Sequence, residues 1–96
     1  MKNMSISIKD CPKENQFHDM IKSLINRRLV NHCELCKIHV DLTKSKDNRV
    51  PFNVVITATL NDDLVLESKA ASANSLAAFT QALARLERRF DSQKRA

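Results

Sequence analysis

The chain has 96 residues, 43% of them apolar, and its 16 Lys and Arg outnumber 11 Asp and Glu to give a net charge of +5. This length corresponds to one domain, so we expect residues 1–96 to form a single domain around one core. The positive charge favours an anionic partner and argues against an acid-lined active site.

Several residue types that particular functions require are missing. The sequence has no glycine, which phosphate-binding loops and nucleophile elbows use, and no apolar run of the roughly 18 residues that span a membrane. It has no Trp or Tyr and four Phe, so few rings are available to stack on bases. Three cysteines, an odd number, in a chain without an apolar N-terminal run argue against a secreted disulfide scaffold, and we expect a cytoplasmic protein.

The N-terminal part predicts a strand and then an amphipathic helix. Apolar residues alternate with polar ones from Met4 to Ile8, the two-residue period of a strand with one buried face. The helix is expected to begin near Pro12 or Lys13, because proline is tolerated in a first turn. Its apolar stripe comprises Phe17, Met20, Ile21, Leu24, Ile25 and Leu29. Off this stripe, on a basic outer side, lie Lys22, Arg27 and Arg28.

Three further strands are predicted in the middle of the chain. The same alternation marks residues 37–43 and 52–60, and a polar, basic connection, Lys44–Arg49, joins these two strands. A tight hairpin turn is expected at Asn61–Asp63, where Asn and Asp take the positive-φ positions that glycine usually fills. A fourth strand follows at Leu64–Lys69.

The C-terminal segment predicts a second amphipathic helix, capped by Ser72 or Asn74. Its apolar positions, spaced three and four residues apart, are Leu76, Phe79, Leu83, Leu86 and Phe90. The opposite side and the residues past the expected helix end carry Arg85, Arg88, Arg89, Lys94 and Arg95. The helix therefore has one face for the core and another with a concentration of positive charge.

These elements predict an α+β fold, a two-layer sandwich of order β-α-β-β-β-α in which a four-stranded sheet carries both helices on one face. The apolar phase of each strand faces the helices. The opposite, open face is expected to carry Ser5, Ser7, Lys37, His39, Asn53, Thr57 and Thr59. This face lacks the aromatic platform that single-strand RNA readers use.

The basic helix surfaces carry the main functional signal. Lys and Arg side chains on a helix reach successive phosphates of a nucleic acid without reading its sequence. The alternative is a solvated helix face with no partner. Two basic helices on one side of the sheet, together with the basic connection at Lys44–Arg49, favour anion binding.

Other candidate sites are weaker. His32, Cys33, Cys36 and His39 could offer zinc ligands, but alternation places Cys36 and His39 on opposite faces of a strand, so we expect no metal and no other cofactor. No base and orienting acid can be assigned to either cysteine, and Glu87 and Asp91 are expected to form ion pairs on the helix surface. We therefore expect no enzymatic activity and no small-molecule substrate.

The C-terminal region also carries a family resemblance. The stretch Asn74-Ser-Leu-Ala-Ala-Phe79, followed by Leu83-Ala-Arg-Leu-Glu-Arg-Arg-Phe90, is similar to a pattern in the short ribosome hibernation factors, the family of hibernation-promoting factor and ribosome-associated inhibitor A. The hairpin at residues 56–66 and the order of elements also resemble this family.

The resemblance implies a protein of stress or stationary phase that occupies the messenger and transfer RNA channel of the small ribosomal subunit and silences idle ribosomes. It implies contacts with ribosomal RNA and none with a membrane. The residues expected to bind RNA are Lys22, Arg27, Arg28, Arg85, Arg88, Arg89, Lys94 and Arg95. Two alternatives remain open: a general structured-RNA-binding or ribosome-assembly module, and a regulator that binds an acidic protein partner.

Overall fold

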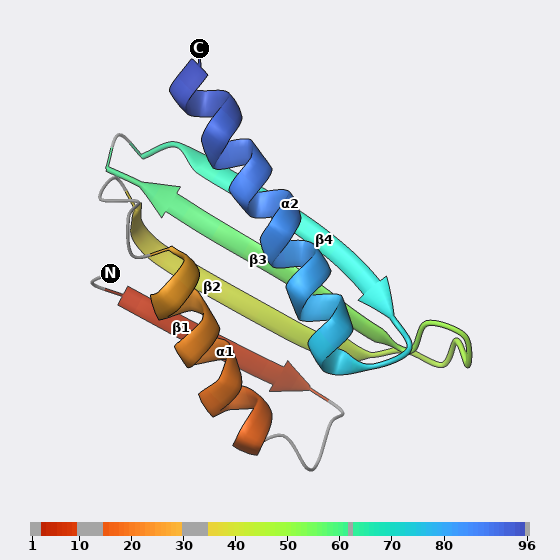
Figure 1. Cartoon of the computed structure of the whole chain (residues 1–96). Helices are drawn as coiled ribbons and strands as arrows, with labels where there is room; N and C mark the ends of the chain where they lie inside the picture. Colours follow the sequence, from red (N-terminus) through yellow and green to blue (C-terminus); the bar gives the residue numbers. More distant parts are fainter. Residues whose placement is uncertain (1–2, 10–14, 30–34, 62, 96) are drawn as a thin grey trace.

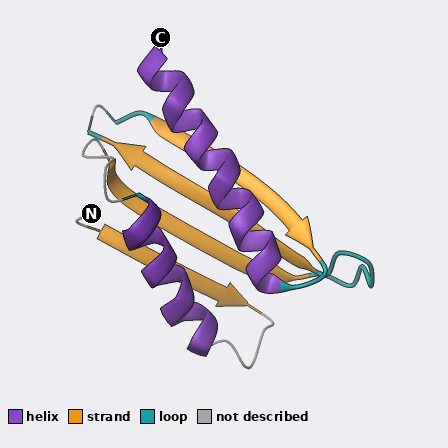
Figure 2. Cartoon of the chain, in the orientation of Figure 1, coloured by secondary structure: helices purple, strands orange, loops and turns teal. Residues whose placement is uncertain are grey.

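The computed structural model describes residues 3–9, 15–29, 35–61 and 63–95. The elements in chain order are β1 (Asn3–Lys9), α1 (Asn15–Arg28), β2 (Leu35–Lys44), β3 (Phe52–Leu60), β4 (Val65–Ser72) and α2 (Ser75–Arg95). The four strands form one sheet in the order β1-β2-β3-β4, and both helices lie on the same face of it (Figures 1 and 2). The predicted α+β sandwich and its order of elements are confirmed.

The sheet is mixed. Strand β1 pairs with β2 in parallel, whereas β2 with β3 and β3 with β4 are antiparallel. A parallel pair needs a crossover connection, and α1 supplies it, which places this helix over the β1 side of the sheet (Figure 1). Strand β4 runs to Ser72, further than predicted from the sequence, because its ladder with β3 continues to the pair Phe52 and Ser72.

The hairpin between β3 and β4 closes as the sequence predicts at the one turn position with positive φ among the described residues, Asp63, where φ is 64°. The amide of Asp63 donates to the carbonyl of Leu60 over 3.0 Å, and the amide of Leu60 donates to that of Leu64 over 2.8 Å. An acidic residue thus fills a left-handed position in a chain without glycine. The predicted role of Asp62 lies outside the described residues.

Strand β2 begins with an irregularity that alternation did not predict. Leu35 pairs with Leu60, but Lys37 pairs with Thr59, so the register shifts at Cys36. In a regular strand Leu35 and Lys37 would share a face. The irregularity lets Leu35 enter the core while Lys37 lies on the open face of the sheet.

The core lies between the helices and the inner face of the sheet. From the helices, and from Leu29 directly after α1, it receives buried side chains; those on the helices include Phe17, Ile21, Ile25, Phe79, Leu83, Leu86 and Phe90. The rings of Phe17 and Phe79 join α1 to α2 edge to face, with centroids 6.4 Å apart. The assignment of Met20 to the buried stripe is wrong, since this side chain is 42% exposed. The residues of α1 that face the sheet, Phe17, Ile21 and Ile25, are spaced by four. Met20 lies on the flank of the helix next to this buried row.

The N-terminus of α2 is capped as expected. Asn74 precedes the first helical residue, and its Oδ1 accepts the amide hydrogen of Ala77 over 2.7 Å. This bond satisfies one of the amides that a helix start leaves without a partner. No helix in the described part of the chain is both long and apolar enough to span a membrane.

Truncation of the core should be far more costly than removal of a surface charge. Leu83 is fully buried, so Leu83→Ala should lower the free energy of unfolding by about 2 to 5 kcal/mol. Arg88→Ala, on the exposed side of the same helix, should change it by less than about 0.5 kcal/mol. Urea denaturation of both variants measures the difference. Similar losses in the two variants would contradict the orientation of α2, in which Leu83 faces the core and Arg88 faces solvent.

Candidate nucleic-acid interface

The helix layer carries the predicted RNA-binding residues on two parallel rows. Lys22, Arg27 and Arg28 lie on α1 and Arg85, Arg88 and Arg89 on α2, and all six side chains are exposed. Lys94 and Arg95 belong to the last turn of α2, and their side chains lie outside the description. Although all six described residues are on one side of the sheet, their side chains have different surroundings.

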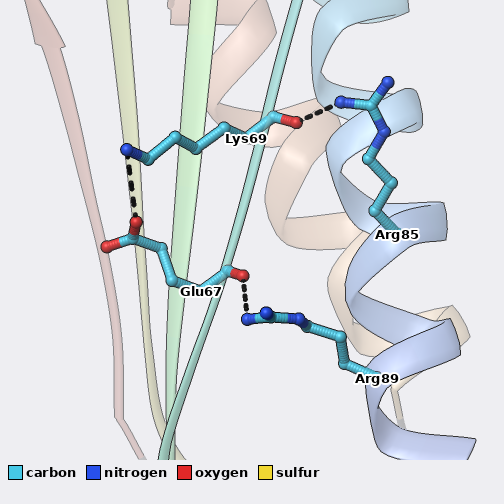
Figure 3. A network of polar contacts seen from close by, with 4 residues as sticks. All are labelled: Glu67, Lys69, Arg85 and Arg89. Atoms are coloured by element: carbon cyan, nitrogen blue, oxygen red, sulfur yellow. Dashed lines mark hydrogen bonds and ion pairs between the residues drawn. The ribbon is translucent and has the colours of Figure 1, made fainter.

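Arg85 and Arg89 contact the edge of the sheet. Arg85 Nη1 donates a hydrogen bond to the carbonyl of Lys69 over 2.5 Å, and Arg89 Nη1 donates one to the carbonyl of Glu67, also over 2.5 Å. The two arginines are four residues apart and stand one above the other on the flank of α2 that faces β4 (Figure 3). Each therefore ties the helix to the outermost strand.

These contacts occupy carbonyls that no neighbouring strand can reach. Strand β4 is at the edge of the sheet and pairs with β3 on one side, so its other side presents backbone groups to solvent. A guanidinium has five N–H donors, and each of these bonds uses one of them. Arg85 and Arg89 therefore cover the edge of β4 and retain donors for an anion.

Arg28 is engaged in a different way, by an ion pair between the helices. Its Nη2 lies 2.5 Å from Oε1 of Glu87 on α2, and both side chains are about one-third exposed. Oε1 is buried and has no partner in hydrogen-bonding geometry, so charge attraction is what holds the two groups. Glu87 thus pairs as expected, but with α1 rather than with a neighbour on its own helix. Partial exposure limits such a pair to about 1 kcal/mol.

Lys22, Arg27 and Arg88 are the unengaged members of the predicted set. Within the described part of the chain, no hydrogen bond or ion pair involves any of these three side chains. Their positive charges are not neutralised by a carboxylate, and they are free to meet an anionic partner. They are therefore the strongest candidates for phosphate contacts on the helix layer.

An apolar groove that the sequence did not predict lies between α1 and the N-terminal half of α2. It has a volume of about 330 Å³ and is lined by Met20, Ser23, Leu24, Leu76 and Thr80. The misassigned Met20 is thus a groove residue rather than a core residue. The sequence does indicate this groove in one way. The apolar stripe of α1 is wider than the row of residues that packs on the sheet, so some of its apolar side chains must lie elsewhere.

The basic connection between β2 and β3 is distant from the C-terminal ends of α1 and α2, where most of the positive charge of the helices lies. It extends from the end of the sheet where α2 begins, whereas Arg95 ends α2 at the opposite end (Figure 1). Its backbone is braced internally, since the amide of Ser45 donates to the carbonyl of Pro51 over 2.6 Å and the amide of Arg49 to Oδ1 of Asp47 over 2.9 Å. The connection and the C-terminal charges do not form one patch.

Of the four candidate zinc ligands, Cys36 and His39 lie within the described residues. In residues 3–9, 15–29, 35–61 and 63–95, no three His, Cys, Asp or Glu side chains gather as metal ligands would. Cys36 is a half-buried free thiol at the irregularity of β2. His32 and Cys33 lie outside the described residues.

The chain shares its fold with the solved structure of a ribosomal subunit interface protein from Coxiella burnetii. The TM-score is 0.83, and the superposition covers 98% of this chain and 99% of that chain. The sequence identity is 12%, so the likeness is one of fold. None of the protein-family models or curated proteins compared with the chain matches it. The resemblance to the ribosome hibernation factors is confirmed at the level of the fold.

Removal of the two edge arginines should promote self-association. In the double variant Arg85→Ala, Arg89→Ala, the carbonyls of Lys69 and Glu67 lose their donors and the β4 edge becomes available to another strand. We expect a larger species in sedimentation velocity and a stability loss of at most about 1 kcal/mol per bond.

The double variant Arg27→Ala, Arg88→Ala is the matched control, because it also removes two exposed positive charges from the helix layer without touching β4. If the control and the edge variant associate equally, then repulsion between positive charges, and not the arginine contacts at the β4 edge, prevents self-association.

Proposed function

We propose that this protein binds the ribosome and suppresses translation without catalysis. The observation that carries the proposal is the end-to-end likeness of fold to a ribosomal subunit interface protein. The net charge of +5 agrees with a partner rich in RNA, because neutralising phosphates releases counterions and drives association. The protein would act in the cytoplasm, where ribosomes are found.

The proposed contact is between the helix layer and ribosomal RNA of the small subunit, in the channel for messenger and transfer RNA. Lys22, Arg27 and Arg88 are exposed and unengaged, and we assign them the principal phosphate contacts. Arg85 and Arg89 would add donors from the side of β4, and Lys94 and Arg95 would extend the contact along α2. Arg28 contributes less, since Glu87 partly neutralises it.

The mechanism is occupation of a site rather than turnover. A thin two-layer molecule with extents of 39 × 23 × 20 Å would fill part of an RNA-lined channel. Phosphate contacts position a protein on RNA and do not depend on base identity. One molecule would therefore silence one ribosome for as long as it stays bound.

Binding should be strongly dependent on salt. The affinity for small subunits should fall linearly with salt on a log–log plot, with a slope of about 0.7 to 0.9 per phosphate neutralised. Fluorescence titration at several salt concentrations measures this slope for the wild type and for Arg88→Ala. The variant should lower the slope by about one contact, and a salt-independent affinity would contradict the proposed interface.

Reversal of the unengaged cations should abolish inhibition. The triple variant Lys22→Glu, Arg27→Glu, Arg88→Glu places three negative charges where the proposal requires attraction to phosphate. We expect it to lose inhibition in a cell-free translation extract and to compete no longer with messenger or initiator transfer RNA for the small subunit. Wild-type inhibition should reach its limit near one protein per ribosome.

The matched control is Lys44→Glu, Lys46→Glu, Arg49→Glu, which makes the same change of charge in the connection between β2 and β3. Equal loss in both triple variants would indicate a general effect of charge. Binding to free structured RNA but not to ribosomes would favour a general RNA-binding module, and binding that survives removal of RNA would favour an acidic protein partner.

A further inference from the structure

The face of the sheet opposite the helices contains a polar hollow. Its volume is about 240 Å³, and its lining residues are Ser5, Lys37, His39, Thr57 and Thr59. They come from the adjacent strands β1, β2 and β3. Ser5, His39 and Thr57 lie side by side in one row across the strands, and Lys37 and Thr59 lie side by side in the next row. Side chains of adjacent rows are roughly 6.6 Å apart along a strand. The hollow is thus a compact set of polar groups outside the helix layer.

Three of the side chains that line this hollow have free donors. Within the described residues, the ammonium of Lys37 has no ion pair, and the hydroxyls of Thr57 and Thr59 have no hydrogen bond. Both threonines lie on the central strand β3, which is paired on both sides and held rigidly. Lys37, Thr57 and Thr59 thus line the same hollow, and their polar groups have no partner of their own within the described residues.

The wall of the hollow is fixed by a hydrogen-bonded histidine. Nδ1 of His39 lies 2.5 Å from Oγ of Ser5, and its Nε2 lies 3.3 Å from Oδ1 of Asp41. With the proton on Nε2 toward the carboxylate, Nδ1 accepts the hydroxyl hydrogen of Ser5. The imidazole is therefore held in place on both sides.

Among the described side chains of this face, Lys37 is the cation without an ion pair. Glu67 on β4 lies beside Thr57 in the sheet, but its carboxylate pairs with Lys69, whose Nζ is 3.5 Å from Oε1. Lys69 belongs to a row of residues next to the hollow and not to its lining. Asp41 is likewise one row away and faces His39. Each described carboxylate on this face thus has a cationic or ring N–H partner, and Lys37 has none.

We propose that this hollow binds one phosphate group of an RNA backbone. Lys37 would supply the charge and the hydroxyls of Thr57 and Thr59 two directed hydrogen bonds, the combination that a phosphate with several acceptor oxygens prefers. The side chains of Thr57 and Thr59 are separated by about the distance that a phosphate spans when it accepts a hydrogen bond of about 2.8 Å from each of two opposite sides. The identity of the ligand as RNA rests on the proposed function, whereas affinity for a phosphate group does not.

The chain Ser5–His39–Asp41 does not make this hollow a site of acyl transfer. Such chemistry also needs an oxyanion hole, which many enzymes build from backbone N–H groups. Strand β2 pairs with β1 and β3, and β3 pairs with β2 and β4, so the backbone amides beneath the hollow are engaged in the ladder. The arrangement is suited to holding an anion.

The first test uses inorganic phosphate as the probe, titrated at constant ionic strength and followed by two-dimensional NMR. We expect saturable shifts at Lys37, His39, Thr57 and Thr59. The double variant Thr57→Val, Thr59→Val, which keeps the branched shape of both side chains, should weaken this response at least fivefold. Shifts confined to α1 and α2, or none, would overturn the proposal.

Lys37→Ala and Lys69→Ala form a matched pair, since both lysines lie on the open face but Lys69 is paired with Glu67. Lys37→Ala should weaken phosphate binding at least fivefold and Lys69→Ala less than twofold. Equal effects would mean that the face responds to charge in general, and would overturn a specific hollow. Lys37→Ala replaces an exposed side chain, so it tests the site even if the valine variant folds poorly.

The second test uses ribosomal small subunits. The double valine variant should bind them at least threefold more weakly than the wild type, with the helix layer intact. Undiminished binding would overturn the contact with RNA. Failure of the wild type itself to bind ribosomes would count against the proposed function alone, because the phosphate titration is independent of it.

Discussion

The packing of α2 against the inner face of the sheet is the contact on which the rest of the structure depends. Its rotation is set by one buried row, Phe79, Leu83, Leu86 and Phe90. Because angular positions on a helix are fixed, that row directs Arg85 and Arg89 to the β4 edge and Glu87 toward α1, while Arg88 stays exposed and unengaged. A purely apolar constraint thus decides which arginines bind the backbone and which remain free.

This division changes how the basic residues are to be interpreted. Arg85 and Arg89 look like surface charge in the sequence, yet each donates to a carbonyl of an edge strand. Their substitution alters the sheet edge as well as the charge, so a loss of binding in such variants has two possible causes. Lys22, Arg27 and Arg88 lack such contacts among the described residues, and their reversal isolates electrostatics.

The sequence predicts the elements and the two layers well because periodicity and capping are local. The α2 stripe, the cap at Asn74 and the positive φ of Asp63 all follow from a few neighbouring residues. The shifted register at Cys36 and the pair between Arg28 and Glu87 do not, since they depend on partners far along the chain. The hollow was missed for the same reason: alternation placed its residues on one face but could not show which of them lie side by side.

The two faces of the molecule differ in a way that can orient it. The helix layer presents unpaired cations, whereas among the described side chains of the open face Glu67 pairs with Lys69, Asp41 contacts His39, and Lys37 is the cation without an ion pair. Long-range attraction to RNA would therefore act first on the helix layer. A single phosphate site with short hydroxyl donors would act later and at close range, since hydrogen bonds need direct contact. Charge would then determine that the helix layer approaches RNA first, and the hollow on the opposite face would bind a phosphate group only where the RNA comes into direct contact with it.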